Sequence, residues 1–106
     1  ERIAALWLTL KGYRILARRV RTPVGEVDLV ARRGRTLVFV EVKARASPDR
    51  LTDALDGRAL ARVHRAANLL LSRFGRGCES MRIDAIVVAP RRWPRHLTGL
   101  GEGEWR

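Results

Sequence analysis

Cysteine and long apolar segments are scarce in this chain, and each scarcity excludes a class of protein. Cys78 is the only cysteine among 106 residues, which excludes an internal disulfide and makes a reducing cytoplasm the expected compartment. No apolar run approaches the roughly 20 residues that a membrane-spanning helix needs, and the pattern of a signal peptide is missing. We therefore expect a soluble cytoplasmic protein with no membrane partner.

Acidic residues are also few relative to basic ones. Eleven acidic residues stand against 22 basic ones, almost all of them arginine, and the formal net charge is +11. Such an excess is typical of proteins with a polyanionic partner, most often nucleic acid. The alternative is that coding bias in a GC-rich genome produces the arginines without any such partner.

The length and composition predict one domain with a basic tail. An apolar fraction of 46% over 106 residues is enough for a single core. Residues 1–90 carry the regular hydrophobic patterns and are expected to form an α/β domain. Residues 91–106 are rich in arginine, proline and glycine, and we expect a C-terminal tail packed on or extending the same domain.

Hydrophobic periodicity predicts alternating helices and strands. Apolar residues at helical spacing from Ile3 to Leu10 predict a first helix, with Gly12 as its cap and Trp7 in the core. The remaining expected elements are a strand over 13–21, a hairpin over 25–45, a polar linker over 46–56, a helix over 57–74 and a strand over 81–89. The helix between the last two strands permits a crossover connection, so we expect a central mixed sheet of about four to five strands flanked by helices.

The hairpin over 25–45 carries charges where a buried strand should not have them. The stretch from Thr36 to Val42 would be a continuous apolar run but for Glu41, and Lys43 follows it. Asp28 interrupts the preceding strand in the same way. Charged residues on core strands are costly unless they are paired or bind a metal, so their presence indicates a site.

The register of the hairpin follows from its turn. Glycine is favoured at the first central position of a type II′ turn, which makes Gly34-Arg35 the loop. Cross-strand partners then have residue numbers that sum to 69, so Asp28 lies opposite Glu41 on one face. By the same rule Glu26 lies opposite Lys43, and the other face is apolar, pairing Val27 with Val42, Leu29 with Val40 and Ala31 with Val38.

Two facing carboxylates need an explanation. Their Cβ atoms would be only about 4.5–5.5 Å apart, and the like charges would repel. A divalent cation between Asp28 and Glu41 removes the penalty, and Lys43 on the same face could position a water or offset charge on a phosphate. From the pattern alone, a buried charge network with a basic partner explains these residues equally well.

These residues also carry a family resemblance. The stretches GEVDLV (25–30) and VFVEVKAR (38–45) resemble the signature of the YraN-like family of small bacterial proteins, and the match extends to GYRIL (12–16) and RID (82–84). The family is identified with the restriction-endonuclease-like, or PD-(D/E)XK nuclease, fold and is similar to Holliday-junction resolvases. The resemblance implies a central sheet flanked by helices.

The resemblance also implies an activity, a metal-dependent endonuclease that hydrolyses phosphodiester bonds in DNA, including branched DNA. Asp28, Glu41 and the Val42 carbonyl would bind Mg²⁺ or Mn²⁺, while Lys43 would orient the attacking water. Glu26 is a weaker supporting candidate. Glu1 is another, since a glutamate on the first helix joins the metal site of related resolvases. Related resolvases also act in pairs, which makes a homodimer an expectation.

The sequence departs from the wider pattern at two places. Val27 replaces the proline that gives the PD-(D/E)XK motif its name, as is usual in the YraN-like family. Ala59 and Leu60 occupy positions near the start of the second helix where relatives often carry lysine or glutamine. Either catalysis is weakened by that loss, or an arginine on the same helix substitutes for the missing side chain.

The arginines supply candidate contacts to nucleic acid, with DNA as the expected partner and RNA as the alternative. The candidates are Arg45, Arg58, Arg62, Arg91, Arg92 and Arg95. Trp93 stands among the last three, which suits phosphate contact with base stacking. A packed tryptophan with solvated neighbours explains the same pattern.

The remaining polar residues have plainer interpretations. We interpret Asp84 as a structural hydrogen-bonding residue and expect His64 and His96 to be solvated. The functional alternative to a nuclease is a non-catalytic nucleic-acid-binding module, or an adaptor, that keeps the nuclease fold.

Overall fold

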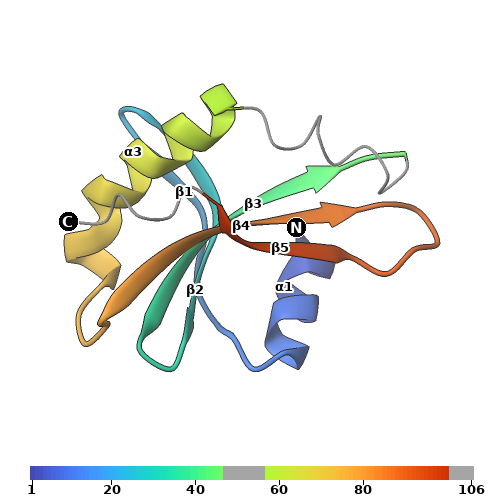
Figure 1. Cartoon of the computed structure of the whole chain (residues 1–106), viewed down its shortest axis with the longest axis horizontal. Helices are drawn as coiled ribbons and strands as arrows, with labels where there is room; N and C mark the ends of the chain where they lie inside the picture. Colours follow the sequence, from blue (N-terminus) through green and yellow to red (C-terminus); the bar gives the residue numbers. More distant parts are fainter. Residues whose placement is uncertain (47–56, 101–106) are drawn as a thin grey trace.

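The computed structural model describes residues 1–46 and 57–100, so most of the predicted linker lies outside the described residues. It shows a five-stranded mixed sheet with helices packed against it (Figure 1), which confirms the predicted α/β class. The elements are α1 (Arg2–Leu10), β1 (Arg14–Thr22), β2 (Gly25–Arg33), β3 (Thr36–Ala44), α3 (Gly57–Phe74), β4 (Ser80–Val88) and β5 (Arg95–Leu100).

The strands lie in the order β1-β2-β3-β4-β5, which leaves β1 and β5 at the two edges. The first three strands form an antiparallel meander, β4 is parallel to β3, and β5 is antiparallel to β4. A parallel neighbour requires a crossover, and α3 lies on that connection as predicted. Among the described helices, none is long and apolar enough to cross a membrane.

The β2–β3 turn has the predicted geometry. Gly34 has a φ of +60°, the left-handed value that a type II′ turn needs at its first central residue. The paired residues run from Arg33 with Thr36 to Leu29 with Val40, and every pair sums to 69. The predicted register is therefore confirmed over this part of the hairpin.

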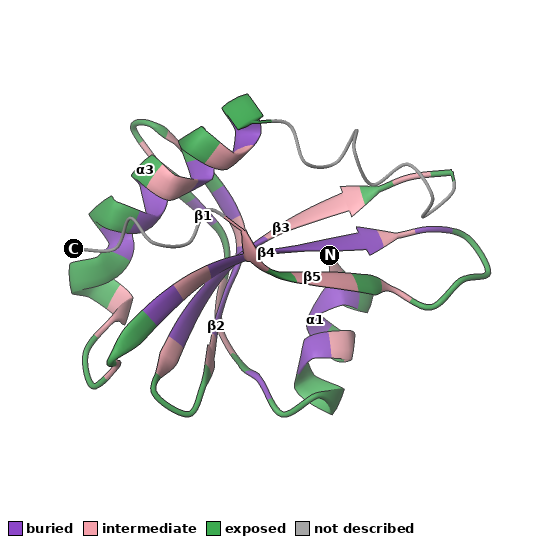
Figure 2. Cartoon of the chain, in the orientation of Figure 1, coloured by how far each residue is buried: buried purple, intermediate pink, exposed green. Residues whose placement is uncertain are grey.

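The sheet separates two hydrophobic layers. Val30, Leu37 and Phe39 face α3, whereas Leu29, Val38 and Val40 face α1, as the alternation of strand side chains requires. Phe39 and its neighbours on β3 are completely buried, and the purple stretches of Figure 2 follow these middle strands. The charged end of β3 thus begins where the two-sided core stops.

The helix α1 buries its small residues rather than most of its large ones. The helix buries Ala4, Ala5 and Leu8, while Leu6 and Leu10 are 61% and 72% exposed. Small side chains let the helix axis approach a sheet face already filled by valine and leucine, so the larger residues turn outward. Trp7, expected in the core, is half-buried.

The strand β5 was not predicted from sequence. Its six residues, R-H-L-T-G-L, contain a glycine and no clear alternation, so local propensity gives a weak signal. His96 on this strand was expected to be solvated, and this is wrong, because its side chain is 3% exposed and bonded to Asp84. His64 is also partly withdrawn from solvent, with a buried Nε2 atom.

Candidate metal and nucleic-acid site

The strands β2 and β3 separate at the point where the candidate residues lie. The described ladder between them ends at Leu29 and Val40. Beyond it, the backbone amide of Val42 donates a hydrogen bond of 2.7 Å to Oδ2 of Asp28. The side chain of Asp28 therefore takes the place of a backbone acceptor, and the predicted direct pairing of Asp28 with Glu41 is absent from the described ladder.

We call the separation of β2 and β3 beyond Leu29 and Val40 the fork. A kink in the backbone accounts for it. Val27 packs on the α3 side and Leu29 on the α1 side, although alternation should place both on one face. The predicted sharing of a face by Val27 and Leu29 is therefore wrong. The register of β1 places Arg19 opposite Asp28, and Arg19 has a φ of +49°, which strands rarely adopt. The kink bends the tip of the β1–β2 hairpin toward α3 (Figure 1).

The hairpin tip meets α3 at a glycine. A side-chain carbon built at Gly25 would lie 3.6 Å from the Cβ of Arg62, and Gly25 has a φ of +154°. That separation is an ordinary contact, so it is the positive φ rather than the space that favours glycine here. The hairpin tip thus lies directly against α3.

Glu41 and Lys43 form an ion pair on the β3 side of the fork. Their side chains are separated by two positions, so they project from the same face, and Nζ lies 2.8 Å from Oε1. The glutamate side chain is only 15% exposed and that of the lysine 27%. A nearly buried carboxylate with one charged neighbour retains oxygen lone pairs for a second positive group.

The electrostatic surroundings of Asp28 are unfavourable for a carboxylate. Burial raises its pKa, and the negative charges of Glu1, Glu41 and Glu26 raise it further, against the opposing hydrogen bond from Val42. The charges of the other three candidate carboxylates therefore act on Asp28. A half-buried carboxylate whose pKa is shifted by burial and by charged neighbours is common at functional sites.

The two weaker candidates have their own partners. Glu1 precedes α1 and accepts a hydrogen bond of 2.8 Å from Nε of Arg19, which raises the pKa of that arginine. Glu26 makes a longer contact of 3.3 Å with Arg21 at the exposed hairpin. Glu1 therefore lies beside the kink at the site, and Glu26 resembles an ordinary surface ion pair.

The donor set suits a hard cation of the Mg²⁺ type. Within residues 1–46 and 57–100, no three carboxylate, histidine or cysteine side chains lie close enough to bind one ion together. Magnesium is commonly held by one or two carboxylates and keeps several waters. Asp28 and Glu41 are the two carboxylates predicted for such a role, and burial, with the neighbouring negative charges adding to it, raises the pKa of Asp28.

The predicted nucleic-acid-binding arginines fall into two groups and one separate residue. Arg45, Arg91 and Arg92 line a hollow of about 610 Å³ with Ile3 at the ends of β3 and β4. Arg58 and Arg62 lie on α3, near the hairpin tip. Arg95 begins β5, opposite Val87 of β4. The first group adjoins Ala44, the residue after Lys43.

A second carboxylate centre lies on β4. Asp84 is completely buried and accepts two hydrogen bonds of 2.8 Å from Arg82, one of 2.6 Å from His96 and one of 3.1 Å from the Gly99 amide. Although burial raises the pKa of Asp84, these hydrogen bonds lower it more, so it falls below its ordinary value. This arrangement gives Asp84 the structural character expected from sequence.

The surroundings of Asp84 extend the network to the segment that follows α1. Arg82 also donates to the Tyr13 hydroxyl, and His96 Nδ1 lies 2.6 Å from Nζ of Lys11. Sequence signals for these contacts are weak, because the partners of Arg82 and His96 include residues 69 and 85 positions away. The alternation of Arg82 and Asp84 on one strand was the only local hint.

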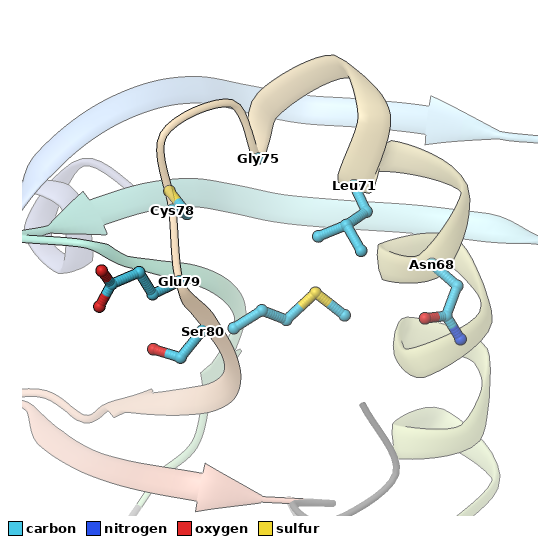
Figure 3. Close-up of a pocket in the computed structure, with 7 residues that line it drawn as sticks. Asn68, Leu71, Gly75, Cys78, Glu79 and Ser80 are labelled. Atoms are coloured by element: carbon cyan, nitrogen blue, oxygen red, sulfur yellow. The ribbon is translucent and has the colours of Figure 1, made fainter. Parts of the chain in front are cut away.

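Another hollow lies at the opposite end of β4 from Arg91. It has a volume of about 350 Å³ between the end of α3 and the start of β4, and Figure 3 shows Asn68, Leu71, Cys78 and Glu79 around it. Its one carboxylate, Glu79, is paired with Arg35 at 2.7 Å. This hollow therefore lacks the converging charges of the fork.

The fold is that of a restriction-endonuclease-like α/β domain. The solved structure of Hjc, a Holliday junction resolvase from the archaeal hyperthermophile Archaeoglobus fulgidus, is similar to it. The TM-score is 0.56 at 24% identity, covering 92% of this chain and 74% of that one. A likeness at this identity establishes the shared fold.

The chain belongs to the uncharacterised protein family UPF0102, the YraN-like family, which it matches over residues 1–88. A UPF0102 protein of Rhizorhabdus wittichii is 55% identical over 98% of this chain and 88% of its own length. One from Sphingopyxis alaskensis is 56% identical over 92% and 84%, respectively. A third, from Methylorubrum extorquens, is 54% identical over 98% and 82%. The resemblance identified from the sequence motifs is confirmed.

Proposed function

We propose that this protein is a metal-dependent endonuclease that hydrolyses phosphodiester bonds in DNA. The observation that carries the proposal is the hydrogen bond from the Val42 amide to Asp28, which joins this half-buried carboxylate to β3 between Glu41 and Lys43, themselves an ion pair. The similar fold of a Holliday junction resolvase supports a nuclease acting on branched DNA.

Each residue has a distinct role in this proposal. Asp28, Glu41 and the Val42 carbonyl would hold Mg²⁺ or Mn²⁺, which supplies Lewis-acid stabilisation of the phosphate and a more acidic bound water. The Val42 amide fixes one oxygen of Asp28 and so orients the other. Lys43 holds Glu41 in place and presents an ammonium group that orients the water and offsets charge developing on the phosphate.

Residues around the fork complete the site. Glu1 and its partner Arg19 lie beside Asp28, where the glutamate supports the metal ligands and the arginine limits repulsion between carboxylates. The arginines at the ends of β3 and β4, with those on α3, bind the phosphate backbone without reading its sequence. Such contacts make binding strongly dependent on salt.

The experiment is cleavage of labelled linear, flapped and four-way DNA in the presence of Mn²⁺. We expect wild type to cut at least one substrate and Glu41→Gln to lose about two orders of magnitude or more, because transition-state charge is no longer stabilised. Glu79→Gln is the matched control, since Glu79 is exposed and lies at the other end of the sheet. Equal cleavage by wild type and Glu41→Gln contradicts the proposal.

One observation favours a second candidate function. Lys43 is already engaged by Glu41, and no third ligating side chain joins Asp28 and Glu41 among the described residues. A non-catalytic DNA- or RNA-binding module would tolerate that arrangement. Salt-sensitive binding that neither a chelator nor Glu41→Gln alters, with no cleavage of DNA or matched RNA, supports this alternative.

A further inference from the structure

Trp93 is the most exposed of the large apolar side chains in the described part of the chain. It lies on the connection between β4 and β5, and 79% of its surface is open to solvent. A single exposed apolar side chain needs no explanation by itself, so the neighbours of this ring decide what it can do. The sequence left open whether this residue is packed or available for stacking, and the structure shows it available.

The ring is held in place from behind and from both ends of the connection. Trp7 of α1 lies against it, with ring centroids 5.6 Å apart and planes inclined by 33°. Arg92 N donates to the Ala89 carbonyl at 3.3 Å, and Pro94 restricts the backbone after the ring. His96 then anchors the chain to buried Asp84. A pre-positioned ring loses little conformational entropy on binding.

The charged residues around the Trp93 ring indicate what kind of partner it would bind. Arg91, Arg92 and Arg95 are exposed beside Trp93, and no acidic residue occurs between Asp84 and Glu102. An aromatic face flanked by guanidinium groups matches a nucleic acid strand, whose bases stack on the ring while the phosphates meet the arginines. A neutral apolar partner would leave those charges without a counterpart.

The connection is joined to the candidate site through the ends of two strands. Arg91 and Arg92 line the same hollow as Ala44 and Arg45, the two residues after Lys43. The Arg45 amide also donates to the Val88 carbonyl at 2.9 Å, which ties the end of β3 to the end of β4. A nucleic acid strand that binds these arginines would therefore extend toward the fork between β2 and β3.

We infer that Trp93 is a stacking platform for an unpaired base of single-stranded DNA, with Arg91 and Arg92 holding the flanking phosphates. The inference rests on the proposed function, because it assigns to the fork a DNA substrate with unpaired nucleotides beside a duplex. Trp7 supports the platform ring rather than contacting DNA itself.

The test compares binding of a short labelled single strand and a duplex of equal length, both in EDTA so that cleavage cannot interfere. Trp93→Ala should weaken single-strand binding by roughly 5- to 150-fold, the range found for loss of one base–aromatic stack. Duplex binding should change little. Trp93→Phe keeps an aromatic face and should retain most of the affinity.

A second readout locates the contact. In a variant with Trp7 and Trp105 replaced by phenylalanine, emission from Trp93 should be quenched by the single strand and not by the duplex. Leu69→Ala is the matched control, because Leu69 is 54% exposed on α3 away from this connection. It should bind both DNAs as wild type does.

Three outcomes overturn the inference. They are unchanged single-strand binding by Trp93→Ala, equal weakening for duplex and single strand, and conversion of a dimer to a monomer in sedimentation with DNA binding intact. The last result assigns the surface to a second copy of the chain. Failure of the proposed function is separate, since it is read from cleavage by Glu41→Gln and not from binding in EDTA.

Discussion

Asp28 and Asp84 are two aspartates on strands of the same sheet, and their surroundings are opposite. Asp84 is enclosed by donors from Arg82, His96 and Gly99, which lower its pKa. Asp28 has the Val42 amide as its hydrogen-bond donor and other carboxylates nearby, and its pKa is raised. The fold compensates the charge of Asp84 and leaves that of Asp28 largely uncompensated, which is what the proposed ligand at Asp28 requires.

The two aspartates differ in which carboxylate the neighbouring arginine bonds to. Arg82 lies two positions from Asp84 on the same face of β4, so its guanidinium reaches the carboxylate with two nitrogens. Arg19 lies opposite Asp28 across β1 and β2, but its Nε bonds to Glu1. Asp28 therefore has no hydrogen bond from Arg19 of the kind that Arg82 donates to Asp84.

The largest expected effect comes from Asp84→Ala. Removing the buried carboxylate leaves the side chain of His96, 3% exposed, and that of Arg82, 26% exposed, without their acceptor. Breaking a buried charged pair costs about 3–5 kcal/mol. Urea unfolding at neutral pH measures the loss in free energy of unfolding. Glu79→Ala, which removes an exposed pair, is the control and should change stability little. Equal free energies of unfolding for Asp84→Ala and Glu79→Ala would contradict the structural role of Asp84.

A cation should stabilise the fork and leave the Asp84 centre unaffected. Mn²⁺ at a concentration 100 times its Kd should raise the free energy of unfolding by about 2.7 kcal/mol, since binding favours the folded state. Glu41→Gln and Asp28→Asn should abolish this gain. Thermal unfolding with and without Mn²⁺ measures it without relying on cleavage, and an equal gain in Glu41→Gln argues against this metal site.

The kink at Arg19 can be tested through its backbone. A β-branched residue tolerates a φ of +49° poorly, so Arg19→Val should lower the Tm by about 4–8 °C. Arg19→Gly loses the same ion pair with Glu1 but accepts the left-handed conformation, and its Tm should stay higher than that of Arg19→Val. Calorimetry on both variants separates backbone strain from charge.

The smallest change in stability is expected from Asp28→Asn without metal. The raised pKa of Asp28 means that its ionisation penalises the folded state as pH rises above about 4, its ordinary value. The variant should therefore match wild type in acid and equal or slightly exceed it at neutral pH. The pKa of Asp84 is lowered, so its ionised form stabilises the folded state at any pH above the ordinary pKa of aspartate. This stabilisation is lost as the pH falls through the pKa of Asp84 in the folded state.

Stability curves against pH for the two asparagine variants distinguish the centres. Asp84→Asn should be less stable than wild type at neutral pH, and its deficit should shrink in acid as the wild-type carboxylate becomes protonated. A neutral-pH deficit in Asp28→Asn as large as that of Asp84→Asn would show that both aspartates are structural.

Local patterns in the sequence were sufficient for much of the fold. The helix over Gly57–Phe74 and the turn at Gly34 were predicted where the structure has them, because amphipathic spacing and turn chemistry are local. The face that α1 buries was not predicted, since small Ala4 and Ala5 are weak signals in a hydrophobicity pattern. These alanines contribute by letting the helix axis lie close to the sheet.

At the candidate site, strand charge identified Asp28, Glu41 and Lys43, and their roles remain predictions. The fork could not be predicted, because alternation assumes a regular ladder and the kink at Arg19 interrupts it. The burial of His96 could not be predicted either, since it depends on pairing between β4 and β5 and on a hydrogen bond to Asp84. Contacts of this kind are fixed by tertiary packing.

The position of β1 at one edge of the sheet has a consequence for self-association. An exposed edge strand offers unpaired backbone groups to the edge of another molecule, which is a route to aggregation. Arg14, Arg18 and Arg21 are exposed along this edge, and Arg95 opens the other edge strand. Like charges on approaching edges keep copies of the chain apart, so the arginine excess protects the sheet, and concentrated salt should weaken that protection.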